Sequence, residues 1–528
     1  MYQALLTRKY LTRKIMPMLA MVAVMLSVAT ILVTWSVMGG FLVSLIQSGR
    51  VLVGDVAIVW PNVGFGHYDD LIERLEQDEM IDAATPIIET FGLVQLPDGR
   101  IELIQIKGVD PASYTDVTGF ADTLWWMPID EPTPKDKDRE DIRLSAEALK
   151  TNAGIDLAQI HENGLTLTRP DPETGQLGPA GVLGVEVTGM NYRTKWGGYL
   201  PQGANRAKAD GRIEYDGVFL PQDGSVGLTV LSLDSDGRPV DPKTITMPIA
   251  NEFQSGLYEV DQGTIVIPLE VLQRNLRMDE AQRVSLERDD DGPFGVIVDP
   301  ETGAIRPKMR EVIGIDPARV TTVLVKKTDD VELDVMRKRV REIYAEFARE
   351  HQGEVPSSQD MFWQVKTWED LNRTMISAVK KETGLVLFIF GIVSFTTVFL
   401  VLAIFWSMAS EKTKDIGVLR ALGASTMGIA WLWIRYGAVI GVVGASVGTV
   451  LGYWIVSNIN GIHDWIGEHT GLVIWDPQQY YFIEIPSDVD PTKALIVFVV
   501  GVLTCVLGAL LPAWHSARMD PVKALRFE

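Results

Sequence analysis

Four long stretches of the chain contain no aspartate, glutamate, lysine or arginine. They are residues 15–49, 383–410, 436–463 and 494–517. Each is longer than the roughly 20 apolar residues that cross a bilayer as an α-helix. This pattern excludes a wholly soluble protein and predicts four membrane-spanning helices.

The charge of the chain is concentrated between the first two of these windows. The 528 residues carry a net charge of −21, but residues 46–383 alone hold 36 basic and 59 acidic side chains, a net charge of −23. Such an acidic body repels phosphate backbones, so nucleic acid is not expected as a partner. The single cysteine, Cys505, lies in the last window, so no intramolecular disulfide can stabilise the body.

The loops that flank the windows predict the orientation of the helices. Four basic residues between positions 8 and 14 precede the first window, and such flanks are normally kept in the cytoplasm. Residues 411–420 and 518–526 are also basic, whereas 460–492 contain six acids and no lysine or arginine. We therefore expect both termini inside and the acidic body outside. The first window is far longer than the roughly 7–15 apolar residues of a signal peptide, which predicts an uncleaved anchor.

The composition of the body predicts a mixed α and β structure. Apolar runs rich in β-branched residues predict strands at 51–60, 101–109, 264–267 and 320–326. Apolar residues at helical spacing predict helices at 68–77 and 331–350. Because strands occur near both ends of the body, we expect one core domain, with residues from about 125 to 260 forming an inserted subdomain.

A long helix is expected to connect the body to the second span. No proline or glycine interrupts residues 368–383. One helix over 368–410 would extend about 65 Å, more than twice the roughly 30 Å hydrocarbon core of a bilayer. The excess would project from the membrane as a stalk.

The sequence shows no recognisable catalytic, nucleotide-binding or metal-binding motif. It lacks G-x-x-x-x-G-K-[ST] and has no Gly-Lys dipeptide, so ATP and its magnesium ion are expected on a separate subunit. None of the six histidines has metal-ligand spacing to another convincing ligand, so no metal site is expected. The acidic run at 289–291 lacks the alternating ligands of a calcium-binding loop and is interpreted as a solvated turn. We expect no catalytic residue.

Glycines recur every three or four residues in the third window, at Gly437, Gly441, Gly444, Gly448 and Gly452. Part of this run matches the G-x-S-x-G pattern of hydrolases, but a hydrolase needs that serine on a strand-to-helix turn. Here the serine lies in the middle of a span. Close packing of helices is therefore the preferred interpretation.

The loop after the second window predicts a short amphipathic helix over residues 411–423. Ser410 can cap its start and Gly423 can end it. Ile416, Leu419 and Leu422 then fall on one face. Composition leaves open whether this helix lies among lipid headgroups or docks into a partner protein.

Two motifs resemble those of a known family. Residues 410–425, SEKTKDIGVLRALGAS, resemble a signature of FtsX-like and MacB-like ABC transporter permeases, with Asp415 where glutamate is usual. Residues 512–526, PAWHSARMDPVKALR, resemble the ending of these permeases. Shorter segments at 36–41 (SVMGGF), 108–111 (GVDP) and 183–186 (LGVE) resemble lipoprotein-releasing-system permeases of the LolC/LolE type, with Gly39 in place of the usual asparagine. The resemblance does not cover residues 125–175 or 195–260.

The resemblance implies a fold and a set of partners. The fold would be an α-helical membrane protein with four transmembrane helices and a large α+β extracytoplasmic domain, a MacB-like periplasmic core, inserted between helices 1 and 2. The chain would be a non-enzymatic permease of the inner membrane. It would work with two copies of an ABC ATPase subunit, a second permease copy or paralogue, membrane lipid, and a periplasmic carrier or adaptor.

The resemblance also implies roles for particular residues. The helix over 411–425 would be the coupling helix seated in the ATPase, through Glu411, Lys412, Asp415, Ile416, Gly417, Leu419, Arg420, Leu422 and Gly423. Met38 and Phe41 of the first span, with Leu385 and Phe388 of the second, would face the cargo.

Together, these observations predict nine segments. They are a basic helix (1–14), span one (15–47), the outer domain (48–367), the stalk and span two (368–410), the coupling helix (411–425), span three (428–459), an outer loop (460–492), span four (493–515) and a cytoplasmic tail (516–528).

Three functions are compatible with this organisation. The leading hypothesis is ATP-driven extraction of a lipoprotein or hydrophobic cargo from the outer leaflet by mechanotransmission. One alternative is efflux of small molecules or peptides with a periplasmic adaptor. Another is FtsX-type mechanical activation of a cell-wall hydrolase, although the outer domains of such proteins are usually much smaller.

Overall fold

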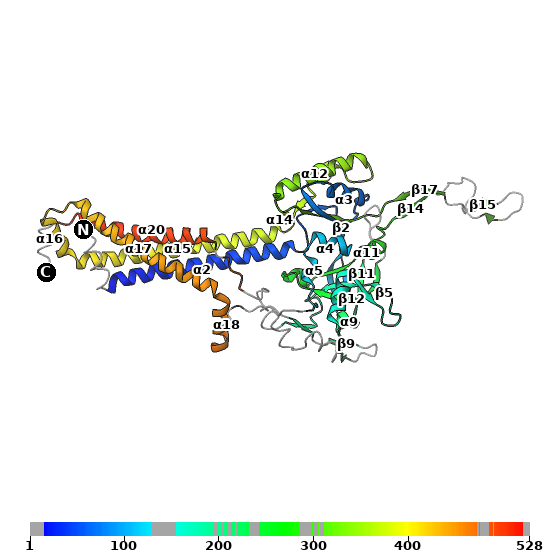
Figure 1. Cartoon of the computed structure of the whole chain (residues 1–528), viewed down its shortest axis with the longest axis horizontal. Coiled ribbons are helices and arrows are strands. Elements are labelled where there is room, and N and C mark those ends of the chain that lie inside the picture. Colours follow the sequence, from blue (N-terminus) through cyan, green and yellow to red (C-terminus); the bar gives the residue numbers. More distant parts are fainter. Residues whose placement is uncertain are drawn as a thin grey trace. The chain divides into compact units, whose positions relative to one another are not determined.

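The protein, shown as a computed structural model in Figure 1, divides into two compact units. The helical unit comprises Met1–Ile46 and Thr374–Glu528, and the α/β unit comprises Gln47–Arg373. The structure describes residues 15–128, 155–193, 199–201, 204–207, 213–216, 219–231, 242–285, 297–298, 305–306, 311–472, 475, 485–488 and 490–520. The predicted helix over 1–14, the acidic turn at 289–291 and the last residues of the C-terminal motif lie outside the described residues.

Four long apolar helices make up most of the helical unit (Figure 1). They are α2 (Ile15–Arg50), α15 (Arg373–Glu411), α17 (Thr426–Ser457) and α20 (Pro491–Ala517). The shorter helices α16 (Thr413–Ala421) and α18 (Ile459–Thr470) follow α15 and α17. Among the described residues, these four long helices are long and apolar enough to cross a membrane. The prediction of four such helices together with a large α+β region is confirmed.

Helix α17 approaches two neighbouring helices through its run of glycines. A Cβ atom added to Gly437 or Gly441 would lie 2.8 or 2.9 Å from side chains of α20. A Cβ atom on Gly448 would lie 2.6 Å from a backbone oxygen of α2, and Gly444 and Gly452 face α2 as well. The two parts of the run therefore serve different partners, and the missing side chains allow backbone contacts that strengthen van der Waals packing.

The helix that enters the second span begins later than the sequence predicts. Instead of one helix over 368–410, α14 (Trp368–Leu371) forms a separate turn, and Asn372 leaves helical geometry before α15 begins. The physical reason is a local start signal. Thr367 and Asp370 form a reciprocal capping box around α14. Helix α15 still has 39 residues and is about 58 Å long at 1.5 Å per residue.

One nine-stranded sheet forms the centre of the α/β unit. Its strand order is β11-β12-β6-β13-β3-β2-β18-β1-β19. The bounds of these strands are β1 (Val56–Val59), β2 (Ile81–Gln95), β3 (Ile101–Val109), β6 (Gly181–Gly184), β11 (Ser225–Val230), β12 (Lys243–Phe253), β13 (Thr264–Pro268), β18 (Thr322–Lys327) and β19 (Val365–Thr367).

Strand β2 is long enough to pair with two strands along one of its edges. Its first half pairs with β18, and its last residues, Gly92–Gln95, pair with β11. Because β11 also begins the strand order, this second pairing closes a ring of six strands, β2-β3-β13-β6-β12-β11. The ring closes tightly at Gly92, where an added Cβ atom would lie 2.6 Å from the carbonyl oxygen of Thr229.

Part of the predicted inserted subdomain over about 125–260 belongs to the core domain instead. Strands β6, β11 and β12 all come from it, and all three belong to the central sheet. The reason lies in two pairings: β6 pairs with β13, and β11 pairs with β2. Without these pairings the ring of six strands would not be closed. Strands β6, β11 and β12 are therefore core strands.

Helices and small hairpins surround the central sheet. The helix α3 (Tyr68–Glu76) packs against α12 (Leu333–Glu350), and both bury apolar side chains in the main core. The other helices are α4 (Pro111–Val117), α5 (Phe120–Thr123), α8 (Leu157–Thr166), α9 (Leu220–Asp223), α10 (Tyr258–Asp261), α11 (Leu269–Leu276) and α13 (Ser358–Met361). Paired outside the sheet are β4 (Thr168–Pro170) with β5 (Leu177–Pro179), β7 (Asn191–Arg193) with β8 (Tyr199–Pro201), β9 (Ala204–Ala207) with β10 (Ile213–Asp216), β14 (Ala281–Ser285) with β17 (Glu311–Asp316), and β15 (Ile297–Val298) with β16 (Ile305–Arg306).

The two ends of the α/β unit meet in neighbouring strands. Strand β1 begins six residues after α2 ends, and β19 ends six residues before α15 begins. These strands pair antiparallel, with Val56 opposite Thr367. The pairing continues one residue further, because the Trp368 N–H donates to the Asp55 carbonyl oxygen at 3.1 Å. The chain segments next to the first two membrane-length helices are thus hydrogen-bonded to each other.

A buried lysine fixes the segment that follows α2. The Lys107 side chain is 6% exposed, and its Nζ lies 2.9 Å from Oε1 of Glu89. Lys107 and the Tyr114 hydroxyl both donate to the carbonyl oxygen of Leu52, at 3.4 and 3.1 Å. Burial lowers the pKa of Lys107, but its interactions with Glu89 and Tyr114 together outweigh this effect and the pKa is raised. Burial also raises the pKa of Tyr114 to about 12, which keeps its hydroxyl a donor.

We expect the two members of this ion pair to differ in their effect on stability. Glu89→Leu leaves the ammonium group of Lys107 buried without its carboxylate and should cost about 3–5 kcal/mol. Lys107→Met leaves Glu89, whose side chain is 32% exposed and can be solvated, so the loss should be about 1 kcal/mol. Thermal unfolding of the detergent-purified chain measures both, and equal losses for the two variants would contradict this account of the pair.

Candidate functional site

A cavity of about 310 Å³ lies among three helices of the helical unit. Its lining comes from α2, α15 and α20 and is mainly apolar. The lining residues are Val24, Ser27, Val28, Ile31, Trp35, Leu387, Phe390, Gly391, Ser394, Thr397, Ile496, Val497, Val500, Gly501 and Thr504. Its size falls at the lower end of the range of about 300–1,000 Å³ that is typical of sites for small ligands.

Hydroxyl groups in the cavity wall are largely occupied by the protein itself. The Thr397 hydroxyl donates to the carbonyl oxygen of Val393 at 2.8 Å and lies 3.3 Å from Ser27 Oγ. The Thr504 hydroxyl donates to the carbonyl oxygen of Val500 at 2.9 Å. Such bonds to the preceding helical turn satisfy the hydroxyls locally. The wall therefore favours an apolar ligand over a strongly polar one.

Two glycines in the cavity wall have different roles. A Cβ atom on Gly501 would lie 2.5 Å from a methyl carbon of Val28, so this glycine allows α20 to pack against α2. A Cβ atom on Gly391 would meet nothing within 4 Å. Gly391 therefore keeps space open. The sequence motifs did not predict this role, although Gly391, Ser394 and Thr397 recur every three residues as a stripe of small side chains on one helix.

The four residues predicted to face cargo do not line this cavity. Leu385 and Phe388 on α15 are 60% and 67% exposed, and Met38 and Phe41 on α2 are half-buried. On α2 the lining ends at Trp35, before Met38, and on α15 it begins at Leu387. A role for these four residues in contacting cargo remains a prediction.

Close packing within the helical unit occurs at the SVMGGF segment of α2. A Cβ atom on Gly40 would lie 2.5 Å from the Ser487 Cα atom. A Cβ atom on Gly39 would instead meet the end of a flexible side chain, 2.7 Å from Lys493 Nζ, which also binds the Asp488 carboxylate at 2.7 Å. The first approach involves backbone, which cannot move aside easily, whereas the second can be relieved by a change of rotamer.

The predicted coupling helix is present as α16, but it begins differently from the prediction. Ser410 does not cap it, because α15 continues to Glu411 and Lys412 takes the N-cap position. The reason is that the apolar α15 runs past Ser410, leaving its backbone within the helix. The predicted end is at the right place. Gly423 has a φ of 94°, and Ala424 N–H donates to the Leu419 carbonyl oxygen, as in a Schellman motif.

The three apolar residues predicted to share one face of the α16 loop differ in exposure, and Leu419 is half-buried. Ile416 is 4% exposed and belongs to the core of the helical unit, and Gly417 is also buried. Val418 is 47% exposed and Leu422 is 80% exposed. The polar residues predicted to contact the ATPase are Glu411, Lys412, Asp415 and Arg420. Lys412 binds Asp415 at 2.7 Å, and Arg420 donates a hydrogen bond to the Ala424 carbonyl oxygen. Ile416 thus packs into the core of the helical unit, whereas the Leu422 side chain is exposed.

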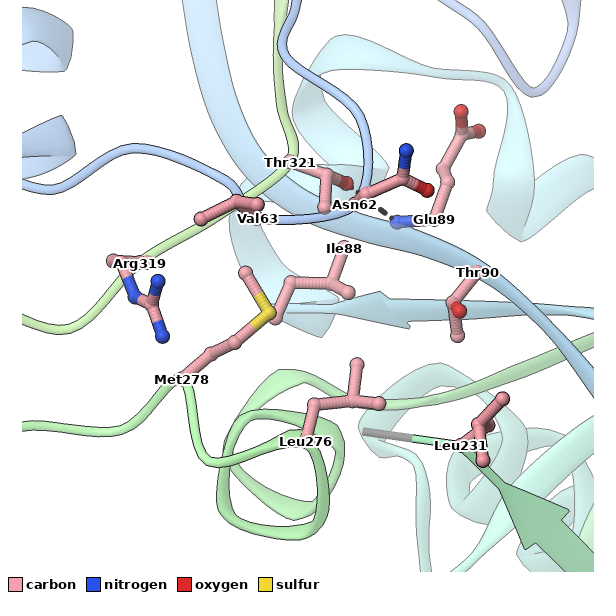
Figure 2. A pocket seen from close by; sticks show the side chains of 10 residues that line it. All are labelled: Asn62, Val63, Ile88, Glu89, Thr90, Leu231, Leu276, Met278, Arg319 and Thr321. Atoms are coloured by element: carbon pink, nitrogen blue, oxygen red, sulfur yellow. Dashed lines mark hydrogen bonds between the residues drawn. The ribbon is translucent and has the colours of Figure 1, made fainter. Parts of the chain in front are cut away.

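A small pocket in the α/β unit offers no catalytic arrangement among its ten described lining residues (Figure 2). The Glu89 N–H donates to Thr321 Oγ1 at 2.7 Å, and the Glu89 side chain extends away from Leu276 and Met278 in Figure 2. Its carboxylate is already bound to Lys107. No nucleophile lies beside a free base in this lining, so we do not assign a reaction to the pocket.

Comparison with known proteins identifies the C-terminal part of the helical unit. Residues 387–521 match the model of the FtsX-like permease C-terminal family. The chain contains an FtsX-like permease domain. The matched segment begins within α15 and includes α16, α17 and α20, so the resemblance found in the loop and C-terminal motifs is confirmed.

Several curated relatives are lipoprotein-releasing system transmembrane proteins. A LolC protein of Xylella fastidiosa (strain 9a5c) is 22% identical over 59% of this chain and 63% of its own length. A LolC protein of Neisseria meningitidis serogroup B is 26% identical over 33% of this chain and 42% of its own length. A LolE protein of Haemophilus influenzae is 28% identical over 22% of this chain and 28% of its own length. The chain thus matches less than two thirds of each of these relatives.

We expect the two neighbouring glycines of α2 to differ in their tolerance of a methyl group. Gly40→Ala should destabilise the helical unit by about 1–3 kcal/mol, because the new Cβ atom overpacks against backbone. Gly39→Ala should cost less than about 1 kcal/mol, because the Lys493 side chain can move. Thermal unfolding midpoints in detergent compare the two variants, and a Gly39→Ala variant as unstable as Gly40→Ala would count against this packing.

Proposed function

We propose that the chain is the membrane subunit of an ABC transporter that extracts an acylated lipoprotein from the outer leaflet of the inner membrane. The cavity among α2, α15 and α20 is the observation that carries this proposal. ATP would be hydrolysed on a separate subunit, because the sequence has no nucleotide-binding motif. The permease domain and the lipoprotein-releasing relatives support the same assignment.

The chemistry of the cavity suits a hydrocarbon chain. Its lining is mainly apolar, and two of its hydroxyls are bound to their own helices. An acyl chain transferred from a bilayer core to such a cavity exchanges one apolar environment for another, so little free energy is needed to remove it from lipid. Gly391 supplies the open space in the wall of α15.

The α16 loop is the proposed contact with the ATPase. Leu422 exposes 80% of its surface at the end of a helix whose start and end are fixed by hydrogen bonds. An exposed leucine on a rigid turn is suited to insert into a partner pocket, where burial of its side chain contributes about 1.5–3 kcal/mol. By symmetry, two permease chains, identical or paralogous, would engage two ATPase subunits.

The pairing of β1 with β19 is the proposed mechanical connection. If α2 and α15 move relative to each other when the ATPases close, both movements reach adjacent strands of one sheet. Backbone hydrogen bonds resist separation of these strands, and Lys107 holds the segment before β1 through the Leu52 carbonyl oxygen. The outer sheet can therefore respond as one body.

The proposed location follows from the loops. The α16 loop and the C-terminal end carry basic residues, whereas residues 460–492 carry acids without lysine or arginine. By the positive-inside rule, the α16 loop and the C-terminal end would be cytoplasmic, and the α/β unit would be periplasmic.

Filling the cavity should prevent binding of an acyl chain. Gly391→Leu adds a side chain where nothing lies within 4 Å of the Cβ position, so we expect the variant to fold but to bind a fluorescent acylated lipoprotein at least about tenfold more weakly, a loss of 1.4 kcal/mol or more. Fluorescence anisotropy of the purified complex measures this affinity.

Gly384→Leu is the matched control for this experiment. Gly384 lies on the same helix, its Cβ position also has nothing within 4 Å, and it does not line the cavity. The control should bind the lipoprotein as the unmodified chain does. Binding retained by Gly391→Leu, or lost equally in both variants, would overturn the assignment of the cavity.

Replacing the exposed leucine of the α16 loop should separate the permease from its ATPase. We expect Leu422→Asp to reduce co-purification of the ATPase at least about tenfold, because a buried carboxylate at the interface is costly, with little change in the thermal stability of the chain. Leu472→Asp, a change at a leucine that is 60% exposed beyond α18, serves as control. Unchanged co-purification of Leu422→Asp would refute this contact.

A further inference from the structure

Two histidines and a glutamate from distant parts of the sequence meet at the surface of the α/β unit. They are His67, which precedes α3, His351, which follows α12, and Glu354 in the turn beyond. One ligand atom from each residue lies within 4.8 Å of the other two. Although 287 positions separate His67 from Glu354, packing of α3 against α12 brings them together.

The contacts within this histidine cluster are specific. His67 Nε2 lies 2.6 Å from Oε2 of Glu354. The rings of His67 and His351 stack with centroids 4.2 Å apart and planes inclined by 20°. Both histidine side chains are about three quarters buried, whereas Glu354 is 64% exposed. The cluster thus has a supported inner side and an outer side open to water.

A second carboxylate orients His351. Asp70 Oδ2 lies 2.8 Å from Nε2 of His351, and the other oxygen of Asp70 accepts a hydrogen bond from Arg74 Nε at 3.0 Å. Arg74 also binds Glu350. A carboxylate that holds one ring nitrogen and leaves the other to a metal ion is the usual support of a metal-binding histidine.

The backbone supports a special role for His67. It adopts φ 58° and ψ 24°, a left-handed conformation that is unfavourable for residues with a Cβ atom. A glycine would take this conformation without cost. Unfavourable backbone geometry concentrates at functional sites, where the side chain has a use that offsets it. The turn at His351 is also fixed, because the Glu354 N–H donates to the His351 carbonyl oxygen at 3.1 Å.

We propose that His67, His351 and Glu354 bind a divalent transition-metal ion of the Zn²⁺ type. Two imidazole nitrogens and one carboxylate oxygen form a donor set that suits Zn²⁺, Cu²⁺ or Ni²⁺, whereas Mg²⁺ and Ca²⁺ prefer oxygen ligands throughout. Tetrahedral Zn²⁺ with bonds of about 2.0–2.2 Å places its ligands about 3.4 Å apart. Small side-chain rotations would bring the cluster to this geometry, with water at the open side as the fourth ligand.

Such an ion would cross-link the start of α3 to the turn after α12. Both helices cover the central sheet, and α12 leads through α13 to β19. Binding to the folded state alone would raise the thermal stability of the α/β unit in proportion to the logarithm of ion concentration.

Titration of the full-length chain with Zn²⁺ tests this proposal. The chain is purified in detergent, freed of any histidine tag and stripped with a chelator, and Zn²⁺ binding is measured by competition with a chromophoric chelator. We expect one ion per chain. His67→Gly and Glu354→Gln should each weaken binding at least about tenfold, since even loss of a supporting residue typically costs 10- to 100-fold.

Two controls distinguish loss of metal binding from a general effect on the folded chain. Without metal, His67→Gly should unfold at the same temperature as the unmodified chain or a higher one, because glycine accepts the left-handed backbone. His161→Ala, at a histidine on α8 outside the cluster, should leave Zn²⁺ affinity unchanged. The absence of one-to-one binding to the unmodified chain, or equal binding by His67→Gly, would overturn the proposal.

Discussion

The pairing of β1 with β19 is the constraint on which the rest of the structure depends. The chain leaves α2, builds the whole α/β unit, and must return to the strand beside the one with which it began. This return fixes the two ends of the sheet domain to each other through hydrogen bonds such as Trp368 N–H to the Asp55 carbonyl. Lys107 adds a second attachment at the start of the α/β unit. It is ion-paired with Glu89 and donates a hydrogen bond to the carbonyl oxygen of Leu52, which precedes β1. In the proposed function, a domain tied in this way would transmit a relative movement of α2 and α15, which loosely attached ends would not do.

The helical unit follows a different physical rule. Lipid tails are as apolar as leucine, so helices in a membrane associate through close backbone contact rather than through exclusion of water. The glycines of α17 meet α20 on one side and α2 on the other, and Gly40 admits the segment before α20. Gly391 and Gly384 of α15 differ from these glycines, because a Cβ atom at either position would meet nothing within 4 Å. Of these two, Gly391 lines the proposed cargo cavity.

Sequence patterns predicted the long-range architecture where one local property was decisive. Charge-free windows gave the four membrane-length helices, and β-branched runs gave strands such as β3. The patterns failed where the outcome depends on tertiary contact. Three strands of the 125–260 stretch join the central sheet because they pair with strands from other parts of the chain. Ser410 lies within α15 because this apolar helix continues to Glu411. The cavity and the meeting of His67 with His351 arise from helix packing, which no spacing in the sequence reveals.

The most direct test of the account is release of an acylated lipoprotein from proteoliposomes that contain the chain and its ABC ATPase partner. An acyl-binding protein in the surrounding solution captures whatever leaves the membrane, and the captured fraction is measured after addition of ATP. The account predicts release that requires hydrolysis, so a non-hydrolysable ATP analogue should leave the lipoprotein in the vesicles. A complex that hydrolyses ATP while the lipoprotein stays in the bilayer would contradict it.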